Sequence, residues 1–123
     1  MCDPNLNTPS LTVSREVLRD VMERAGYVRS SIADAELALV ELISNAWRHG
    51  RTPSPAVAIT VEGGTVRVVV ADRSSTLPER RTFTELSESG RGLQLVEGLT
   101  HRWGAEPLKL GKRVWFELDG FLA

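Results

Sequence analysis

Three polar side chains interrupt one long apolar segment, SIADAELALVELISNAWRHG, and they follow one another at intervals of four residues. They are the carboxylate of Glu41, the amide of Asn45 and the imidazole of His49. On a helix this spacing sets Glu41 and Asn45 one turn apart on one face, and His49 follows after a modest drift. Because a carboxylate buried without a partner is costly, the stripe is expected to face a polar cleft, a ligand or a metal ion. The alternative is a solvated helix face, or an Asn and a His that neighbouring backbone groups satisfy.

Two further positions carry polar groups that could do chemistry. Asp72 ends an alternating segment on the face to which its valines point, where no structural reason for a carboxylate is apparent. It either points into a pocket or caps the next turn as an edge residue. Gly90-Arg91-Gly92 stands where a helix can begin, and a Gly-x-Gly at a helix N-terminus allows backbone N–H groups to hold an anion.

The apolar segment itself predicts a long helix from Ser31 to Gly50. Ser31 is a suitable N-cap with Asp34 three residues on, and Gly50 stands where a left-handed C′ residue is needed. Apolar side chains cover most of the circumference, which predicts that the helix is buried. These side chains are Leu37, Leu39, Val40, Leu42, Ile43, Ala46 and Trp47.

The N-terminal part of the chain predicts a loose segment followed by a helix. Residues 1–10 contain two prolines and several small polar residues, which is typical of a flexible N-terminal arm. Apolar residues then recur at helical spacing between an N-cap at Ser14 and a stop at Gly26. Residues 11–123 are therefore expected to form a single domain.

Residues 56–62 and 65–72 predict two strands of a hairpin. Gly63-Gly64 lies between them, and a two-residue turn of this kind needs the positive φ that glycine accepts. This turn fixes the register, so that three apolar pairs lie on one face of the hairpin. The pairs are Val61 with Val66, Ile59 with Val68, and Val57 with Val70.

The C-terminal half predicts a long loop, a short helix and a second hairpin. Residues 73–90 are polar and without a clear period, and apolar residues at helical spacing begin at Leu93. Strands follow over residues 101–106 and 113–118, with a turn near Gly111. The predicted fold class is α+β: a two-layer α/β sandwich with helices on one face of a mainly antiparallel sheet.

Composition narrows the class of protein. Of 123 residues, 41% are hydrophobic and 25% charged, as in an ordinary soluble globular domain. With a net charge of −1 and no block of Lys or Arg, direct binding of nucleic acid is not expected. Cys2 is the sole cysteine, which excludes an intrachain disulfide and makes the reducing cytoplasm the expected location. No apolar run reaches the length of a membrane span, so no membrane partner is expected.

Three motifs resemble, in order and spacing, those of the GHKL ATPase superfamily. ELISNAWRHG resembles the N box, VVVADRSSTLP the first glycine box and SGRGLQLV the second glycine box. The short chain, the His-Gly ending of the N box and the closing GKRVWFEL most resemble the anti-sigma-factor serine kinases, particularly the actinobacterial regulators. The resemblance covers about residues 18–118 and implies a Bergerat-type ATP-binding fold, a left-handed βαβ sandwich that holds ATP under a lid.

The resemblance also implies roles for single residues. Asn45 would ligate the Mg²⁺ that bridges the phosphates, and Glu41 would be the catalytic base that takes the proton from a partner's serine. Asp72 would accept the adenine amino group, near Ser74, which stands where the first glycine box usually has glycine. The remaining expected ATP-binding residues are His49, whose alternative is to anchor the helix end, and the phosphate-cradling Gly90, Arg91, Gly92 and Leu93.

The function implied by the resemblance is that of a protein serine/threonine kinase that uses ATP and Mg²⁺. Its expected partners are a sigma factor that it sequesters and a STAS-domain anti-anti-sigma protein that it phosphorylates. The alternative is a catalytically weak or inactive binding module of the same fold that acts only by capturing proteins. Lys112 and Arg113 stand where many relatives have threonines near the adenine. Trp115, expected on the sheet face away from the helices, makes that face a candidate interface, and the alternative is an exposed aromatic with no such role. A homodimer is a further possible assembly.

Overall fold

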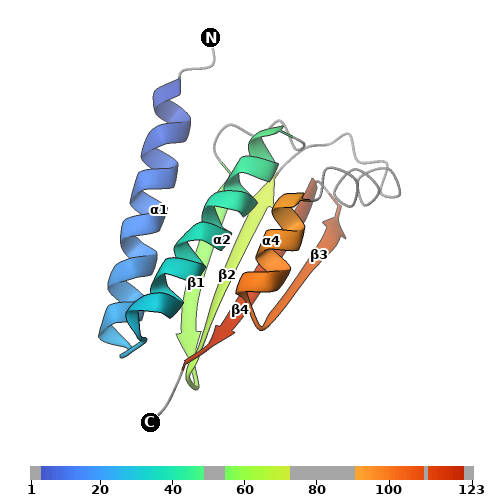
Figure 1. Cartoon of the computed structure of the whole chain (residues 1–123). Coiled ribbons are helices and arrows are strands. Elements are labelled where there is room, and N and C mark those ends of the chain that lie inside the picture. The colour runs from blue at the N-terminus through green and yellow to red at the C-terminus, as the bar shows by residue number, and fades with distance from the viewer. Residues whose placement is uncertain (1–3, 49–54, 73–90, 110, 121–123) are drawn as a thin grey trace.

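A computed structural model describes residues 4–48, 55–72, 91–109 and 111–120 of the chain. Three helices and four strands lie in these ranges (Figure 1). Their order and bounds are α1 Pro4–Arg24, α2 Arg29–Arg48, β1 Ala56–Glu62, β2 Thr65–Asp72, α4 Arg91–Leu99, β3 Arg102–Leu108 and β4 Gly111–Asp119.

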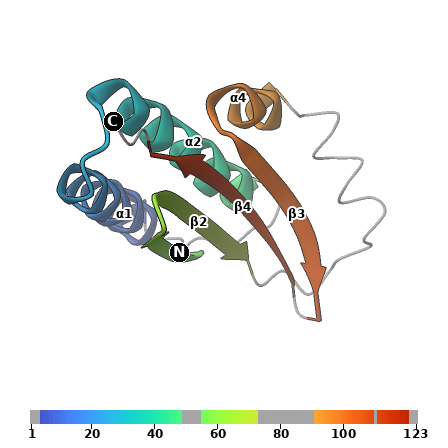
Figure 2. The same cartoon turned by 90° about the horizontal axis from the view of Figure 1, so that it is seen from below.

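The four strands form one sheet in the order β1-β2-β4-β3, and every neighbouring pair is antiparallel. The helices gather on one face of this sheet, with α2 between α1 and α4 (Figure 2). Since β2 and β3 are both antiparallel to β4, they run parallel to each other on either side of it, joined through α4. The predicted two-layer α+β sandwich is confirmed.

The first hairpin has the predicted register at every position. Gly63 and Gly64 have φ values of 60° and 82°, as the two central residues of a type I′ turn require. Glu62 pairs with Thr65, and the three predicted valine and isoleucine pairs follow in step. The consequence is that Asp72, at the end of β2, lies on the face that the helices cover.

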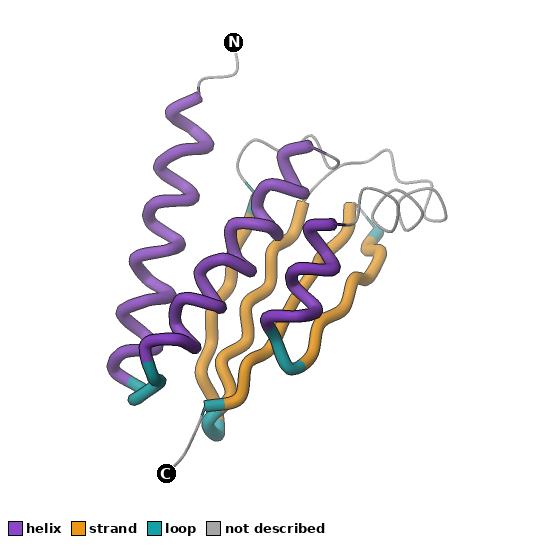
Figure 3. The backbone as a smooth tube through the Cα atoms, viewed as in Figure 1, coloured by secondary structure: helices purple, strands orange, loops and turns teal. Residues whose placement is uncertain are grey.

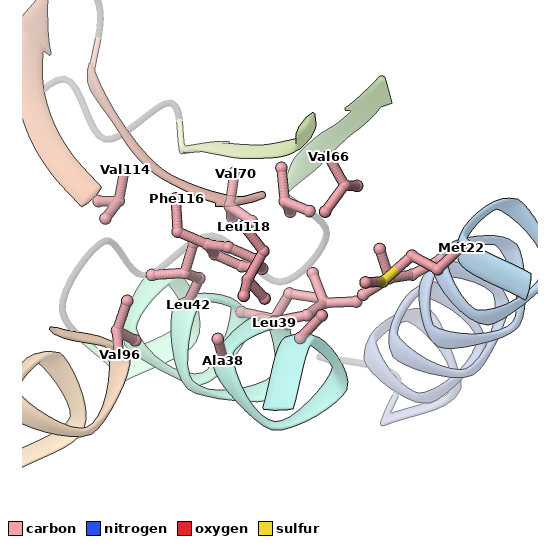
Figure 4. Packing of buried hydrophobic residues seen from close by; sticks show 14 of the residues in the cluster. Met22, Ala38, Leu39, Leu42, Val66, Val70, Val96, Val114, Phe116 and Leu118 are labelled. Carbon is pink, nitrogen blue, oxygen red and sulfur yellow. The ribbon is translucent and has the colours of Figure 1, made fainter. Parts of the chain in front are cut away.

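The core lies between α2 and the two central strands (Figure 4). The inward residues of β2 and β4 alternate with half-buried outward ones, so each of these strands has one apolar face. Phe116 at the centre of β4 is fully buried and faces Leu39 and Leu42 of α2. Apolar residues of this kind contribute about 1.5–3 kcal/mol each when fully buried, so this layer holds the helices on the sheet.

The start of α1 differs from the prediction. The helix begins at Pro4, so the N-cap predicted at Ser14 is wrong and residues 4–10, predicted as part of the arm, are its first turns. Pro4 is accommodated as the first helical residue because the first helical N–H groups have no intrahelical acceptor to lose. Leu11 packs against the core, so the apolar face of the helix already begins before Ser14.

The predicted helix from Ser31 to Gly50 is α2, and it differs in two respects. It begins at Arg29, and the N–H of Ile32 donates to the carbonyl of Val28, so the helical bonding starts before the predicted cap. It is also not buried all round, because Leu37 is 44% exposed. Gly50 lies outside the described residues.

Both strands of the second hairpin are longer than the six residues predicted for each, with seven residues in β3 and nine in β4. β3 begins at Arg102 rather than His101, and Gly111, predicted in the turn, is already paired with Leu108 as the first residue of β4. Gly111 has φ 108°, which explains why glycine stands at this junction. The predicted facing of β4 is confirmed, with Val114, Phe116 and Leu118 buried and Trp115 on the opposite face.

Tyr27, in the connection between α1 and α2, ties the helices to one end of the sheet. Its hydroxyl donates to the carbonyl of Gly64 at 2.9 Å and lies 3.2 Å from the carbonyl of Leu118. Burial raises the pKa of this hydroxyl, which keeps it a donor. The last turns of α2 and the end of β2 lie at the other end of the sandwich (Figure 1).

Candidate functional site

The predicted site residues come together at one end of the sandwich. The last turns of α2, the end of β2, the first turn of α4 and the first residues of β4 all lie there (Figures 1 and 3). This follows from the topology, because α2 and β2 run toward that end while α4 and β4 start from it. Segments far apart in the sequence therefore supply one site.

Helix α2 contributes Glu41 and Asn45 on successive turns. Asn45 is only 4% exposed, and Glu41 is partly buried. Asparagine is seldom found at such depth, because burying an amide is unfavourable unless it is hydrogen-bonded. Asn45 therefore lies on the covered side of α2, and Glu41 lies one turn earlier in a partly buried position.

Strand β2 contributes Asp72, which is 3% exposed on the helix-covered face, as the alternation predicts. The carboxylate forms an ion pair there, since the Nζ of Lys112 donates to its Oδ2 at 2.6 Å. The two residues are direct cross-strand partners of β2 and β4. The turn that Asp72 would cap in the alternative interpretation lies outside the described residues.

Lys112 is the residue of this site that the sequence interpretation missed as a partner of Asp72. Its side chain is 5% exposed, although lysine is almost never fully buried unless it is paired. The sequence contained a signal for its burial. Val114, Phe116 and Leu118 alternate on the covered face, and two residues before Val114 the same alternation reaches Lys112. Pairing it with Asp72 required the β2–β4 register.

Several predicted ATP-binding residues cannot be placed in the same way. His49, Ser74 and Gly90 lie outside the described residues, as does the loop predicted over 73–90. Arg91, Gly92 and Leu93 form the first turn of α4, so the predicted helix start just after Gly90 is confirmed for the backbone. The N-terminus of α4, with its unsatisfied N–H groups, is thus at the same end as Asn45 and Asp72.

The oxygen donors of this end fit a magnesium nucleotide in part. Mg²⁺ takes few protein ligands and completes its shell with phosphate and water, which suits one amide oxygen such as that of Asn45. No group of three or more His, Cys, Asp or Glu side chains that could hold a metal alone occurs among the described residues. The Asp72 carboxylate suits an amino group as acceptor, but Lys112 already neutralises it.

A groove of about 570 Å³ between α1 and α2 contains none of the predicted site residues. Its polar centre is Glu36 of α2, which accepts hydrogen bonds from Arg19 at 2.8 Å and from Arg15 at 3.3 Å. The hydrogen bonds and charge of Arg19, with a smaller contribution from Arg15, lower the pKa of Glu36 below its ordinary value. We assign this groove to helix–helix packing and not to the candidate site.

Comparison with known families decides the class of this domain. The family model of the histidine kinase-like ATPase domain matches residues 5–117, which is most of the chain. The chain belongs to the histidine kinase-like ATPase family. ATPase domains of this kind bind ATP, typically with Mg²⁺, so the superfamily inferred from the three motifs is confirmed.

Two further findings concern this histidine kinase-like ATPase domain. No curated protein matches the chain significantly. None of the helices in the described part of the chain is both long and apolar enough to span a bilayer. The choice of substrate and partner therefore has to be argued from the domain's own residues.

Proposed function

We propose that this ATPase domain is a regulator that binds ATP, phosphorylates a serine or threonine of a STAS-domain anti-anti-sigma partner and sequesters a sigma factor. The observation that carries the proposal is the placement of Asn45 in α2. It is buried one turn beyond Glu41, at the end of the sandwich where Asp72 and the N-terminus of α4 also lie. The subclass of kinase rests on the motif resemblance alone.

Each side chain has one role in this proposal. Asn45 holds the metal that accompanies the nucleotide, and Asp72 accepts a hydrogen bond from the base. Glu41 would take the proton of the partner's hydroxyl, bound ATP would supply the γ-phosphoryl group to the hydroxyl oxygen, and ADP would leave. The general base Glu41 and the metal ligand Asn45 are one turn of α2 apart, so in this proposal both would face the same phosphate.

The second candidate is a binding module of the same fold with little or no catalysis. The ion pair between Lys112 and Asp72 favours it, because the carboxylate expected to bind the base already has a cationic partner. Such a module would capture the sigma factor or the STAS partner through its surface alone. The two candidates differ in whether nucleotide and phosphoryl transfer matter for function.

A melting curve with and without Mg-ATP tests the shared premise of nucleotide binding. A ligand that binds only the folded state raises the free energy of unfolding by about 2.7 kcal/mol at a hundredfold excess over Kd. We expect a higher Tm with Mg-ATP and a smaller rise for Asn45→Ala. An unchanged Tm at millimolar Mg-ATP would leave only the binding module.

A phosphorylation assay with labelled ATP and purified STAS proteins then separates the candidates. For a kinase, Glu41→Gln should slow transfer by roughly 10²–10⁴-fold, the usual contribution of a positioned general base, while nucleotide affinity stays the same. Glu36→Gln is the matched control, since it removes one carboxylate of the same helix that faces α1 and lies outside the candidate site. Transfer at the wild-type rate by Glu41→Gln would reject the base assignment even if the protein is a kinase.

A further inference from the structure

The ion pair between Asp72 and Lys112 is the most buried pair of charges in the described part of the chain. The two side chains are 3% and 5% exposed, and Nζ and Oδ2 are 2.6 Å apart. They come from directly opposed positions of β2 and β4, and both point to the covered face. The other described ion pairs each have at least one partner that is more than a third exposed.

We propose that Lys112 controls nucleotide affinity by competing with the amino group of the base for the Asp72 carboxylate. This inference rests on the proposed nucleotide site and adds a residue that sets its affinity. In this structure the Asp72 carboxylate is bound to the ammonium group of Lys112. A nucleotide base must therefore displace that ammonium group or share the carboxylate with it.

Geometry and electrostatics both make Lys112 an effective competitor. Opposed cross-strand residues have Cβ atoms only about 4.5–5.5 Å apart, so the β2–β4 pairing holds the Lys112 side chain within reach of the Asp72 carboxylate. Burial leaves the pair little screened by solvent ions, and a neutralised carboxylate is a weaker acceptor for an amino group. Lys112 therefore weakens base binding whether it is displaced or remains in place.

Hypoxanthine, the base of IDP, differs from adenine at position 6 and in carrying a proton on N1. Adenine presents an amino group, which needs the acceptor Asp72, whereas hypoxanthine presents a carbonyl oxygen at the same place, to which Lys112 can donate. Loss of the Lys112 ammonium group should therefore raise the affinity for adenine nucleotides and should not raise the affinity for inosine nucleotides. A general change in stability or charge would affect both in the same direction.

The experiment is calorimetric titration of the full chain with Mg-ADP and with Mg-IDP. The variants are Lys112→Met, which removes the donor, and Lys112→Gln, which keeps a neutral donor for Asp72. The matched control is Arg113→Gln, the neighbouring cation of β4, which lies on the opposite face and pairs with Glu106 at 2.6 Å. It reports the effect of losing one positive charge near an anionic ligand.

We expect ADP affinity to rise roughly 10- to 100-fold in Lys112→Met, the range of one hydrogen bond to a charged group. The rise should be smaller in Lys112→Gln, and neither Arg113→Gln nor the IDP titrations should show it. If Lys112→Met does not fold, the Lys112→Gln titration decides.

Three results would overturn the inference, and they differ in what else they reject. Tight ADP binding by wild type and equally by the Lys112 variants rejects the competition but leaves the nucleotide site intact. An equal gain for ADP and IDP rejects the contact with the amino group. Absence of ADP binding in wild type and in both variants rejects the competition together with the proposed nucleotide function.

Discussion

The two faces of β4 carry ion pairs of similar length in opposite environments. On the covered face Lys112 meets Asp72 at 2.6 Å, with both side chains almost fully buried. On the open face Arg102 meets Glu117 at the same distance, but Arg102 is 47% exposed. The open-face network continues from Glu117 to Arg67, whose guanidinium also lies 4.5 Å from the ring centroid of Trp115.

The difference shows that environment, and not contact distance, decides what an ion pair contributes. Exposed pairs contribute about 0–1 kcal/mol, because water and salt compete with both partners. A buried pair gives little net stability, but removal of one partner leaves an uncompensated charge in a poorly solvated site. The open face therefore tolerates change, whereas the covered face at the Asp72 end does not. The predictions below test this contrast in order of expected effect.

The largest effect is expected for Asp72→Ala, which leaves the ammonium of Lys112 buried without its carboxylate. The free energy of unfolding should fall by about 3–5 kcal/mol. The double variant Asp72→Ala/Lys112→Met should recover most of this loss, since an apolar replacement of a buried ion pair is often neutral. Urea unfolding of the two single variants and the double variant measures the coupling.

The control for that cycle is the pair Arg113 and Glu106 on the open face, whose side chains are 43% and 47% exposed. Glu106→Ala should lower the free energy of unfolding by no more than about 1 kcal/mol. Equal losses for Asp72→Ala and Glu106→Ala would show that burial does not distinguish the two faces.

A smaller loss of stability is expected at Gly104, where the packing of the Trp115 ring, and not an ion pair, is disturbed on the open face. A Cβ added to Gly104 would lie 2.8 Å from three atoms of the Trp115 indole, whose Nε1 is buried and has no hydrogen-bond partner within the described part. Gly104→Ala should therefore cost about 1–3 kcal/mol as the ring shifts, and the tryptophan fluorescence should change. Gly98→Ala in α4 is the control, because nothing lies within 4 Å of its added Cβ and alanine favours a helix by up to about 1 kcal/mol.

The two hairpins show how far sequence reasoning reached in the fold. The β1–β2 register was predicted at each pair because Gly63-Gly64 specifies a two-residue turn, and a fixed turn leaves one pairing. The faces of Phe116 and Trp115 followed from alternation alone. The second hairpin was predicted less well, since Gly111 looked like a turn residue although it opens β4.

The remaining differences depend on contacts between segments distant in sequence. Nothing local to Ser14 shows that the helix extends back to Pro4, because packing of Leu11 on the core contributes to that extension. The inward face of Asp72 was predictable, but its ion pair was not, because Lys112 is 40 residues away and reaches it only through the β2–β4 register. Strand periodicity predicts the face of a side chain, and only the sheet order predicts its neighbour.

The smallest effect is expected for Glu117→Gln in the open-face network. Hydrogen bonds from Arg102 and then Arg67 hold the pKa of Glu117 below its ordinary value, and those from Arg102 and Thr65 do the same for Asp119. A lowered folded pKa means that the unfolded chain binds more protons, so stability from these carboxylates is present above their ordinary pKa values of about 4 and is lost as the pH falls through the folded values. At pH near 7, we expect Glu117→Gln to lose less than about 1 kcal/mol, and less again at high salt.

Measurement of the free energy of unfolding of wild type and Glu117→Gln across acidic and neutral pH checks this sign. The difference between the two proteins should be largest at neutral pH and should shrink in acid, because protonated Glu117 no longer attracts Arg102. Since Arg102 also donates to Asp119, part of the network survives in the variant and keeps the loss small. A loss as large as that of Asp72→Ala, or one that grows on acidification, would contradict the division between the two faces of β4.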